Sequence, residues 1–225
     1  MIEQEQVRSP DKLHTRPFDA ILVHGYWLSE VGKNKARLGW RGNLAVRAAA
    51  LAYDEGRGAR NIVLTEGHVW GPDYPSGAEL MAKKLQNMYH VPEEAIIVKG
   101  DAYSTGGEVE ICMELAHEKG WTSLLDIAAS KHLWTIPGIF KKMGENVQFR
   151  SVEEILREQN DPRMNSILKK LGKSKYEFAL MFYEAGIWTA MHLLNLDYKT
   201  LENRNKSKRT VKGKDFIIPT DVYKT

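Results

Sequence analysis

The chain has 225 residues, of which 43% are hydrophobic and 27% are charged, and it contains one cysteine. This length and composition are typical of one globular domain, and they exclude general disorder, a fibrous repeat and a disulfide scaffold. Residues 1–12 lack the apolar core of a secretory signal, and the longest apolar stretch, residues 178–194, is interrupted by Glu184 and His192. We therefore expect a cytoplasmic protein without a membrane segment.

The formal net charge of +3 is unevenly distributed along the chain. Residues 199–215 carry seven basic and two acidic side chains, a net charge of +5, which leaves −2 for the remainder. We expect one domain over residues 1–198, with a core at 19–150 and a helical extension at 151–198, followed by a basic tail at 199–225. Such a tail attracts nucleic acid or an acidic partner, unless it is only a solvated charge run.

Short apolar runs alternate with segments of helical spacing in the first 150 residues. Five near-continuous apolar runs predict strands at residues 20–24, 62–65, 95–99, 124–128 and 147–150. Apolar residues at helical spacing predict helices at residues 44–55, 81–88 and 109–116, and Pro137 is expected to open a fourth that ends before Gly144. The alternation indicates an α/β fold, a Rossmann-like three-layer sandwich with a mostly parallel five-stranded sheet.

Beyond residue 150 the pattern becomes helical. Residues 151–154 and 174–177 have the spacing of a capping box, so a helix is expected to begin at each. The first helix is expected to end near Pro162 and the second to continue to about Leu196. Because the second is apolar around most of its circumference, it packs on the body or forms a dimer face, and the chain is expected to be a monomer or a dimer.

Polar residues follow four of the predicted strands. The carboxyl ends of parallel strands share one edge of a sheet, where ligands bind, so we expect these residues to converge there around a small anionic or nucleotide-like molecule. The candidate ligand-binding residues are His24, Gly25, Thr65, Gly67, His68, Asp101, Ser104, Thr105, Gly106 and Ser130.

His132 and Glu66 are the candidate catalytic residues. Histidine is the usual acid–base group near neutral pH, and His132 lies on an expected loop beside Ser130 and Lys131. With Glu66 as its partner, His132 would serve a hydrolytic or group-transfer reaction.

Histidine is also a common metal ligand, so the histidines at this edge are candidates for a metal site. His24, His68 and His132 would combine with Glu66 or Asp101. No histidine pair at i, i+4 spacing makes this pattern specific, and such histidines more often form hydrogen bonds or transfer protons. We therefore expect no metal.

The residues Ser104-Thr105-Gly106-Gly107-Glu108 open the third predicted helix. Glycines allow close approach of the backbone, and the amide groups of a helix N-terminus attract an anion. The alternative is that residues 105–108 form a capping box that needs no ligand. A Walker-type ATPase is disfavoured because no lysine follows the glycines.

Residues 25–42 are too long for a simple connection between a strand and a helix. One interpretation is a lid whose cationic side chains bind an anionic substrate. The alternative is a solvated surface loop. Cys112 is on the apolar face of its helix and is expected in the core. The aromatic and basic residues of the segment are Trp27, Lys33, Lys35, Arg37, Trp40 and Arg41.

Four passages, in this order and spacing, resemble the bacterial SanA/ElyC/YdcF-type family, whose function is poorly defined. They lie within residues 19–144, and the resemblance implies a Rossmann-like sheet with a polar pocket to which Gly25, Thr65, Gly67, Thr105 and His132 belong. The passages are Asp19-Ala-Ile-Leu-Val-His-Gly25, Asn61-Ile-Val-Leu-Thr-Glu-Gly67 with Gly56 before it, His90-Val-Pro-Glu-Glu-Ala-Ile-Ile-Val98 with Ser104-Thr105 after it, and Ala128-Ala-Ser-Lys-His132.

The chain departs from this family at several positions, among them the arginine of the first helix, which is present as Arg47 but out of register. The usual Ser-Gly-Gly after the second strand reads Thr65-Glu66-Gly67, the acid that opens the next helix is replaced by Gly77, and the arginine expected three residues after the histidine is Thr135. Since one family member binds S-adenosylmethionine, a binder of this cofactor or a methyltransferase is an alternative function, although the first strand lacks a glycine-rich loop. A further alternative is a non-catalytic adaptor that binds nucleic acid or an acidic partner through its basic tail.

Overall fold

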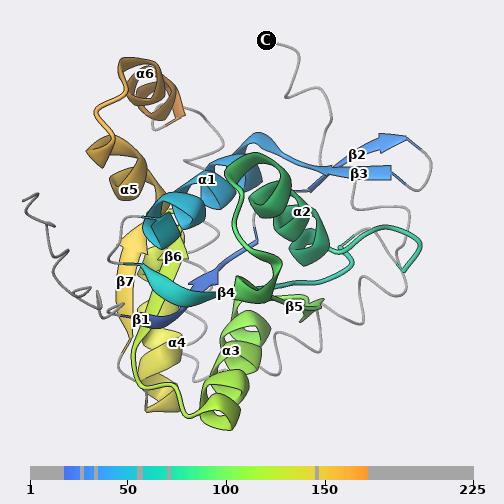
Figure 1. Cartoon of the computed structure of the whole chain (residues 1–225), viewed down its shortest axis with the longest axis vertical. Helices are drawn as coiled ribbons and strands as arrows, with labels where there is room; N and C mark the ends of the chain where they lie inside the picture. Colours follow the sequence, from blue (N-terminus) through green and yellow to red (C-terminus); the bar gives the residue numbers. More distant parts are fainter. Residues whose placement is uncertain are drawn as a thin grey trace, which may run out of the picture.

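The computed structural model describes residues 18–25, 28–32, 35–54, 58–69, 72–144 and 147–171. Its main sheet is parallel throughout, in the order β5-β4-β1-β6-β7 (Figure 1). The prediction of a Rossmann-like α/β sandwich is therefore confirmed. The expected helix at 174–196 and the tail at 199–225 lie outside the described residues. The strands are β1 (Phe18–Val23), β4 (Ala59–Glu66), β5 (Ile96–Ala102), β6 (Leu124–Ala128) and β7 (Gln148–Ser151).

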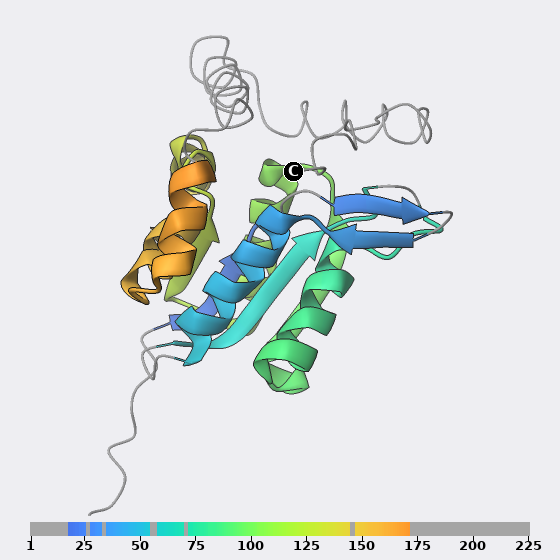
Figure 2. The same ribbon diagram turned by 90° about the horizontal axis from the view of Figure 1, so that it is seen from above.

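Helices cover both faces of this sheet (Figure 2). The helices α1 (Trp40–Asp54), α2 (Gly77–Tyr89) and α5 (Val152–Glu158) share one hydrophobic core with the sheet, whereas α3 (Thr105–Lys119) and α4 (Ile136–Met143) share the other. Successive side chains of a strand point to opposite faces. Ile21 and Val23 of β1 accordingly belong to the first core, and Ala20 and Leu22 to the second.

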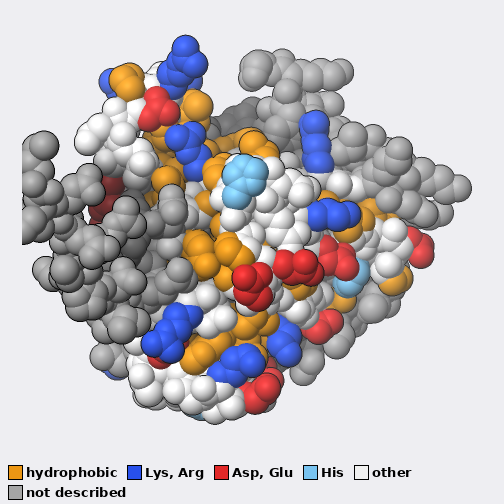
Figure 3. Space-filling model, viewed as in Figure 1, with side chains coloured by type: hydrophobic (Ala, Val, Ile, Leu, Met, Phe, Trp, Pro, Cys, Tyr) orange, Lys and Arg blue, Asp and Glu red, His pale blue; other side chains and the backbone are white. Residues whose placement is uncertain are grey.

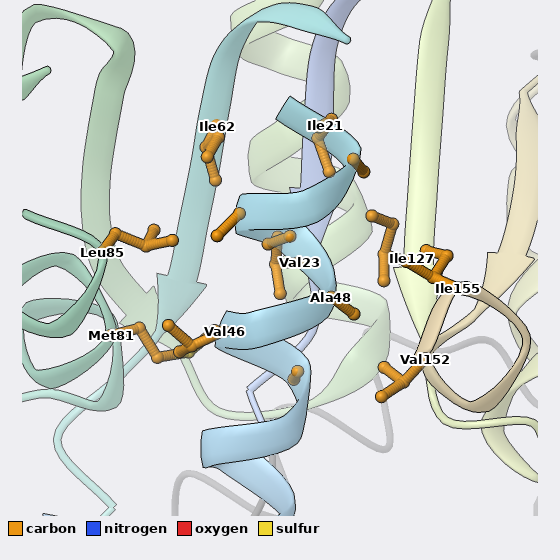
Figure 4. Close-up of a cluster of buried hydrophobic side chains, with 14 of the residues drawn as sticks. Ile21, Val23, Val46, Ala48, Ile62, Met81, Leu85, Ile127, Val152 and Ile155 are labelled. Atoms are coloured by element: carbon orange, nitrogen blue, oxygen red, sulfur yellow. The ribbon is translucent and has the colours of Figure 1, made fainter. Parts of the chain in front are cut away.

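The first core is built around α1. Figure 4 shows Val46 and Ala48 of this helix among side chains of β1, α2 and α5. The buried face of α1 is rich in alanine, with Ala45, Ala48, Ala49 and Ala52 nearly inaccessible, and these small side chains allow the helix to lie close to the strands. Burial of each larger aliphatic side chain in this core contributes about 1.5–3 kcal/mol.

The helices begin and end at capping residues of the sequence, but the sequence-based prediction did not recognise the N-terminal cap of α2. Helix α2 begins at Gly77 rather than near residue 81, because Ser76 and Glu79 form a capping box whose two side-chain to backbone bonds are both present. Gly120 and Gly144 end α3 and α4 with positive φ angles, as expected.

The prediction of a loop over residues 25–42 is wrong for most of this segment. Strands β2 (Leu28–Gly32) and β3 (Lys35–Leu38) form an antiparallel hairpin, and α1 begins directly after it at Trp40. These strands are short and mix apolar with polar or charged residues, so they lack the continuous apolar run that marks the other strands in the sequence. Trp27 and Lys33 lie outside the described residues.

A second helix in the extension was also missed. Pro162 opens α6 (Pro162–Leu171), although the sequence was read as a helix end at this residue. Proline suits the first position of a helix as well as it ends a preceding one. Met164 and Leu168 of α6 join the first core. None of the described helices has the length and hydropathy that spanning a bilayer requires.

Candidate functional site

The candidate site lies at the carboxyl ends of β1 and β6, the two strands at which the chain turns to opposite faces of the sheet. From β1 the chain continues through the hairpin to α1 in the first core, and from β6 it continues to α4 in the second. Ligands of open α/β sheets bind where neighbouring connections diverge in this way. The residues found there come from β6, α1 and α3 and from the segments that follow β1 and β6.

A buried charge cluster, formed by His24, Glu108 and Asp126, is the centre of this site. His24 Nδ1 lies 2.7 Å from Oε2 of Glu108, and His24 Nε2 lies 2.8 Å from Oδ2 of Asp126. The three residues are 2%, 6% and 0% exposed. Charged groups remain ionised at such depth only when partners compensate for the lost water.

The two carboxylates hold a proton on His24. Burial by itself lowers the pKa of this imidazole, but the charges and hydrogen bonds of Asp126 and Glu108 outweigh burial and raise the pKa to about 10. His24 is therefore an imidazolium at neutral pH and donates both ring N–H groups, one to each carboxylate. Burial also raises the pKa of Asp126, against the opposing effect of His24.

Glu108 is free to reach this cluster because another residue caps its helix. The N-cap of α3 is Ser104, whose Oγ accepts from the amide of Gly107. The predicted capping box over residues 105–108 is thus wrong by one position. Instead, Oε1 of Glu108 accepts from the Gly25 amide at 3.1 Å while Oε2 pairs with His24, so Glu108 fastens α3 to the end of β1.

His132 and Arg41 add a second group of nitrogen donors. His132 opens the short helix η2 (His132–Trp134) after β6, and Arg41 is in the first turn of α1, 9% exposed, with its guanidinium 4.9 Å from the Trp40 ring centroid. Burial and the positive charges of His24 and Arg41 lower the pKa of His132 to about 3. His132 is therefore a neutral imidazole at physiological pH.

Glu66 lies on the other side of β1, in a notch made by two glycines. A β-carbon on Gly25 would be 2.3 Å from Cβ, Cδ and Oε2 of Glu66, and one on Gly77 would be 2.0 Å from Oε2. Only glycine at both positions leaves room for this side chain. The Glu66 carboxyl group is thereby held between the end of β1 and the first residue of α2.

Two buried oxygens beneath the site have no hydrogen-bond partner among the described residues. They are Oγ1 of Thr65, which is fully buried, and Oδ1 of Asp126. Thr65 and Val63 are on the same face of β4, and Val63 belongs to the core of α3. Both oxygens are therefore on the side of the sheet that α3 covers.

The remaining predicted residues have local structural roles or lie apart from the cluster. The Gly67 amide donates to Ala102 O at 2.7 Å, His68 Nδ1 lies 2.7 Å from Tyr74 O, and Ser104 caps α3. Asp101 is exposed on the edge strand β5. Gly106 is buried and Thr105 half-buried in the first turn of α3, and the amide of exposed Ser130 donates to Oε2 of Glu153.

Sequence reasoning missed Asp126 and assigned Glu108 and Arg41 other roles. The one signal for Asp126 is an aspartate within the apolar run 124–128, a position where a carboxylate needs a buried partner. Arg41 was counted among the cations of a lid, yet it is a buried helix residue. In the part of the chain that the structure covers, no three histidine, cysteine, aspartate or glutamate side chains are arranged to hold a metal ion.

The surface gives less information than this buried site. On the face drawn in Figure 3, lysine and arginine side chains of the described residues are interspersed with acidic and hydrophobic ones. Several acidic side chains nevertheless lie side by side near the middle of this face. No family model, curated protein or solved structure matches the chain.

Proposed function

We propose that this protein binds a small anionic or nucleotide-like molecule at the carboxyl edge of β1 and β6 and acts on it as a hydrolase or group transferase. The observation that carries the proposal is the placement of half-buried His132 and buried Arg41 close to the His24 cluster, near enough that the charges of His24 and Arg41 add to burial in lowering the pKa of His132. An anion placed there would face the positive charge of Arg41, which is 9% exposed.

The donor chemistry of the site suits an oxyanion. Arginine offers a planar fork of N–H groups that matches phosphate or carboxylate oxygens, and a neutral imidazole adds one N–H donor. The carboxylates of Glu108 and Asp126 do not oppose this role directly, because both face His24. The anion would then bind next to Arg41 and His132, away from the two carboxylates that contact His24.

Glu66 and His132 are the proposed acid–base pair. Glu66 ends β4 and His132 follows β6, with β1 between them in the sheet. Strands in a sheet are about 4.8 Å apart, so the two residues start from backbones roughly 10 Å apart. This separation leaves space for a small substrate whose reacting group lies between a carboxylate and an imidazole.

The resemblance to the SanA/ElyC/YdcF-type family remains a proposal, supported by the parallel sheet and the polar residues at its strand ends. It makes S-adenosylmethionine one of the ligands to be tested. The adaptor alternative depends on residues 199–225, which lie outside the described residues.

A thermal-shift panel on the full-length chain tests the proposal. The panel contains nucleotides, sugar phosphates, a prenyl phosphate, S-adenosylmethionine and inorganic sulfate. A ligand at 100 times its dissociation constant stabilises the folded state by about 2.7 kcal/mol, enough for a clear shift in Tm. We expect at least one anionic ligand to shift the Tm of the wild type and of Arg37→Gln, a control at an exposed arginine of β3, but not of Arg41→Gln. Silence across the panel, or an equal shift in Arg41→Gln, would contradict the proposal.

A further inference from the structure

We propose that the ligand of this site is a nucleotide and that its base stacks on the ring of Trp134. The inference rests on the proposed function, and it names the class of ligand that the same site takes. It starts from an aromatic side chain that the fold leaves exposed in the segment after β6.

The packing of the protein does not use the Trp134 ring. Trp134 is 48% exposed and belongs to neither hydrophobic core. Its apolar neighbours do, because Leu133 packs against the core of α3 and α4, and Ile136 is fully buried within that core. The Trp134 amide donates to Lys131 O at 3.3 Å, which closes the turn of η2. The segment is thus anchored through other residues, and the ring remains open to a ligand.

The position of Trp134 separates it from an ordinary exposed apolar residue, which needs no explanation by itself. Strands β1 and β6 are neighbours in the sheet, with Val23 paired to Ile127 at their carboxyl ends. The connection that leaves β6 carries Trp134 in η2, and the connection that leaves β1 carries Trp40 at the start of α1. A tryptophan therefore lies on each of the two connections that diverge from this edge.

A cation accompanies each of these rings. The Lys131 ammonium lies 5.0 Å from the centroid of the Trp134 ring, and the Arg41 guanidinium lies 4.9 Å from that of Trp40. Such a cation is attracted by the negative face of the ring, so each pair holds a flat apolar surface next to a positive charge. The ligand that matches this combination has a planar ring and an anionic group.

A nucleotide has both parts. Stacking of a base on an aromatic side chain suits every base, because each base has a π-face. With Lys131 over one face of the Trp134 ring, the base would stack on the other, and the phosphate would bind next to Arg41 as in the proposed function. A sugar phosphate offers the anion without the planar ring, and a prenyl phosphate offers a chain in its place.

Two ligands that differ only in the base test this inference. Adenosine monophosphate and ribose 5-phosphate carry the same sugar and the same phosphate. Isothermal titration calorimetry on the full-length chain gives the dissociation constant of each. We expect adenosine monophosphate to bind about 5- to 150-fold more tightly, the range that corresponds to stacking of one base.

Three variants assign this difference to the ring. Trp134→Ala is expected to bind the two ligands equally, whereas Trp134→Phe keeps an aromatic face and most of the preference for adenosine monophosphate. Met88→Ala removes an apolar side chain that is 59% exposed near the end of α2, and it is expected to behave as the wild type. Because Trp134 is exposed, its replacement should leave the Tm without ligand nearly unchanged, which shows that the variants are folded.

The outcomes separate the two proposals. Equal binding of the two ligands by the wild type, or a preference that persists in Trp134→Ala, overturns base stacking and leaves the proposed function in place. Failure of both to bind also overturns it, but an Arg41-dependent hit elsewhere in the ligand panel would still support the proposed function. If no ligand of either experiment binds, both proposals are wrong.

Discussion

Nδ1 of His24 and Oε2 of Glu108 lie 2.7 Å apart, although 84 positions separate the two residues in the chain. The contact joins the first turn of α3 to the end of β1, and Asp126 engages the other ring nitrogen from β6. Three elements that meet only in the folded sheet thus share one protonated ring. The stability of this region is therefore expected to depend on that proton.

The stability of the protein should fall as pH rises above neutrality. The folded-state pKa of His24 is about 10 against a reference of 6.5, so its stabilising contribution is complete below about pH 6.5 and is lost as pH rises towards 10. The loss is up to about 1.4 kcal/mol per pH unit for one proton. Denaturant unfolding between about pH 6 and 9 measures the slope. A free energy of unfolding that is flat or rises over this range would show that His24 is not held protonated.

Neutralising Glu108 should be far more damaging than neutralising another glutamate of the same helix. Glu108→Gln removes one negative partner from a buried histidine, and loss of a partner from a buried ion pair costs about 3–5 kcal/mol. Glu114→Gln alters an exposed residue of α3 and should change stability by less than about 0.5 kcal/mol. Chemical denaturation of the two variants gives the comparison, and equal costs would contradict the structural role of Glu108.

The notch around Glu66 allows a sharper test with alanine substitutions. Gly25→Ala and Gly77→Ala should each destabilise the fold, by about 1–3 kcal/mol for overpacking. Glu66→Ala removes Cγ, Cδ and Oε2, the atoms that a β-carbon on Gly77 would meet, but it retains the Cβ that lies 2.3 Å from a β-carbon on Gly25.

Glu66→Ala should therefore rescue Gly77→Ala but only part of the loss in Gly25→Ala. Double-mutant cycles on the free energy of unfolding measure the two coupling energies. Glu66→Gly combined with Gly25→Ala removes the remaining contact and serves as the control. Equal rescue of both glycine variants by Glu66→Ala would contradict this geometry.

The same notch clarifies one departure from the family resemblance. A side chain at position 77 would enter the space that the Glu66 carboxyl group occupies, since its Cβ would be 2.0 Å from Oε2. The resemblance leads one to expect an acid at position 77 and a glycine at 66, and this chain has the reverse.

Cys112 should resist thiol reagents while the protein is folded. It is fully buried on α3, and burial together with the nearby Asp126 raises its thiol pKa. Both effects disfavour the reactive thiolate. A colorimetric disulfide reagent should react at least about 100-fold faster after denaturation than before it. Rapid reaction of the native protein would place this thiol nearer the surface than the structure does.

The elements with strong local signals could be predicted from the sequence. The run at residues 124–128 is β6 as observed, and Gly120 and Gly144 mark helix ends where expected. The hairpin of β2 and β3 could not be recognised, because its short strands lack a continuous apolar run. Helix α6 was missed because Pro162 reads equally well as an end and as a beginning.

The location of the candidate site could be predicted from the sequence, but the contacts of His24 with Glu108 and Asp126 could not. Parallel strands bring their carboxyl ends together whatever residues they carry, so His24, Glu66 and His132 were found at one edge. That Glu108 reaches His24 depends on a shift of one residue in the cap of α3, and both Ser104 and Thr105 are good capping residues. Asp126 was hidden within a strand whose other four residues are apolar.

The central position of β1 also determines when the charged site is assembled. Its two neighbours in the sheet are β4 and β6, and Asp126 follows His24 by 102 positions. Sheets with such distant pairings fold slowly, because closing the long loop between the paired strands costs conformational entropy before the contact forms. During synthesis, a nascent chain that stops before residue 126 contains His24 but only one of its two carboxylates. The sheet of such a chain also lacks β6, the strand on one side of β1. We therefore expect the amides of β1 to be protected from hydrogen exchange only after β6 has left the ribosome.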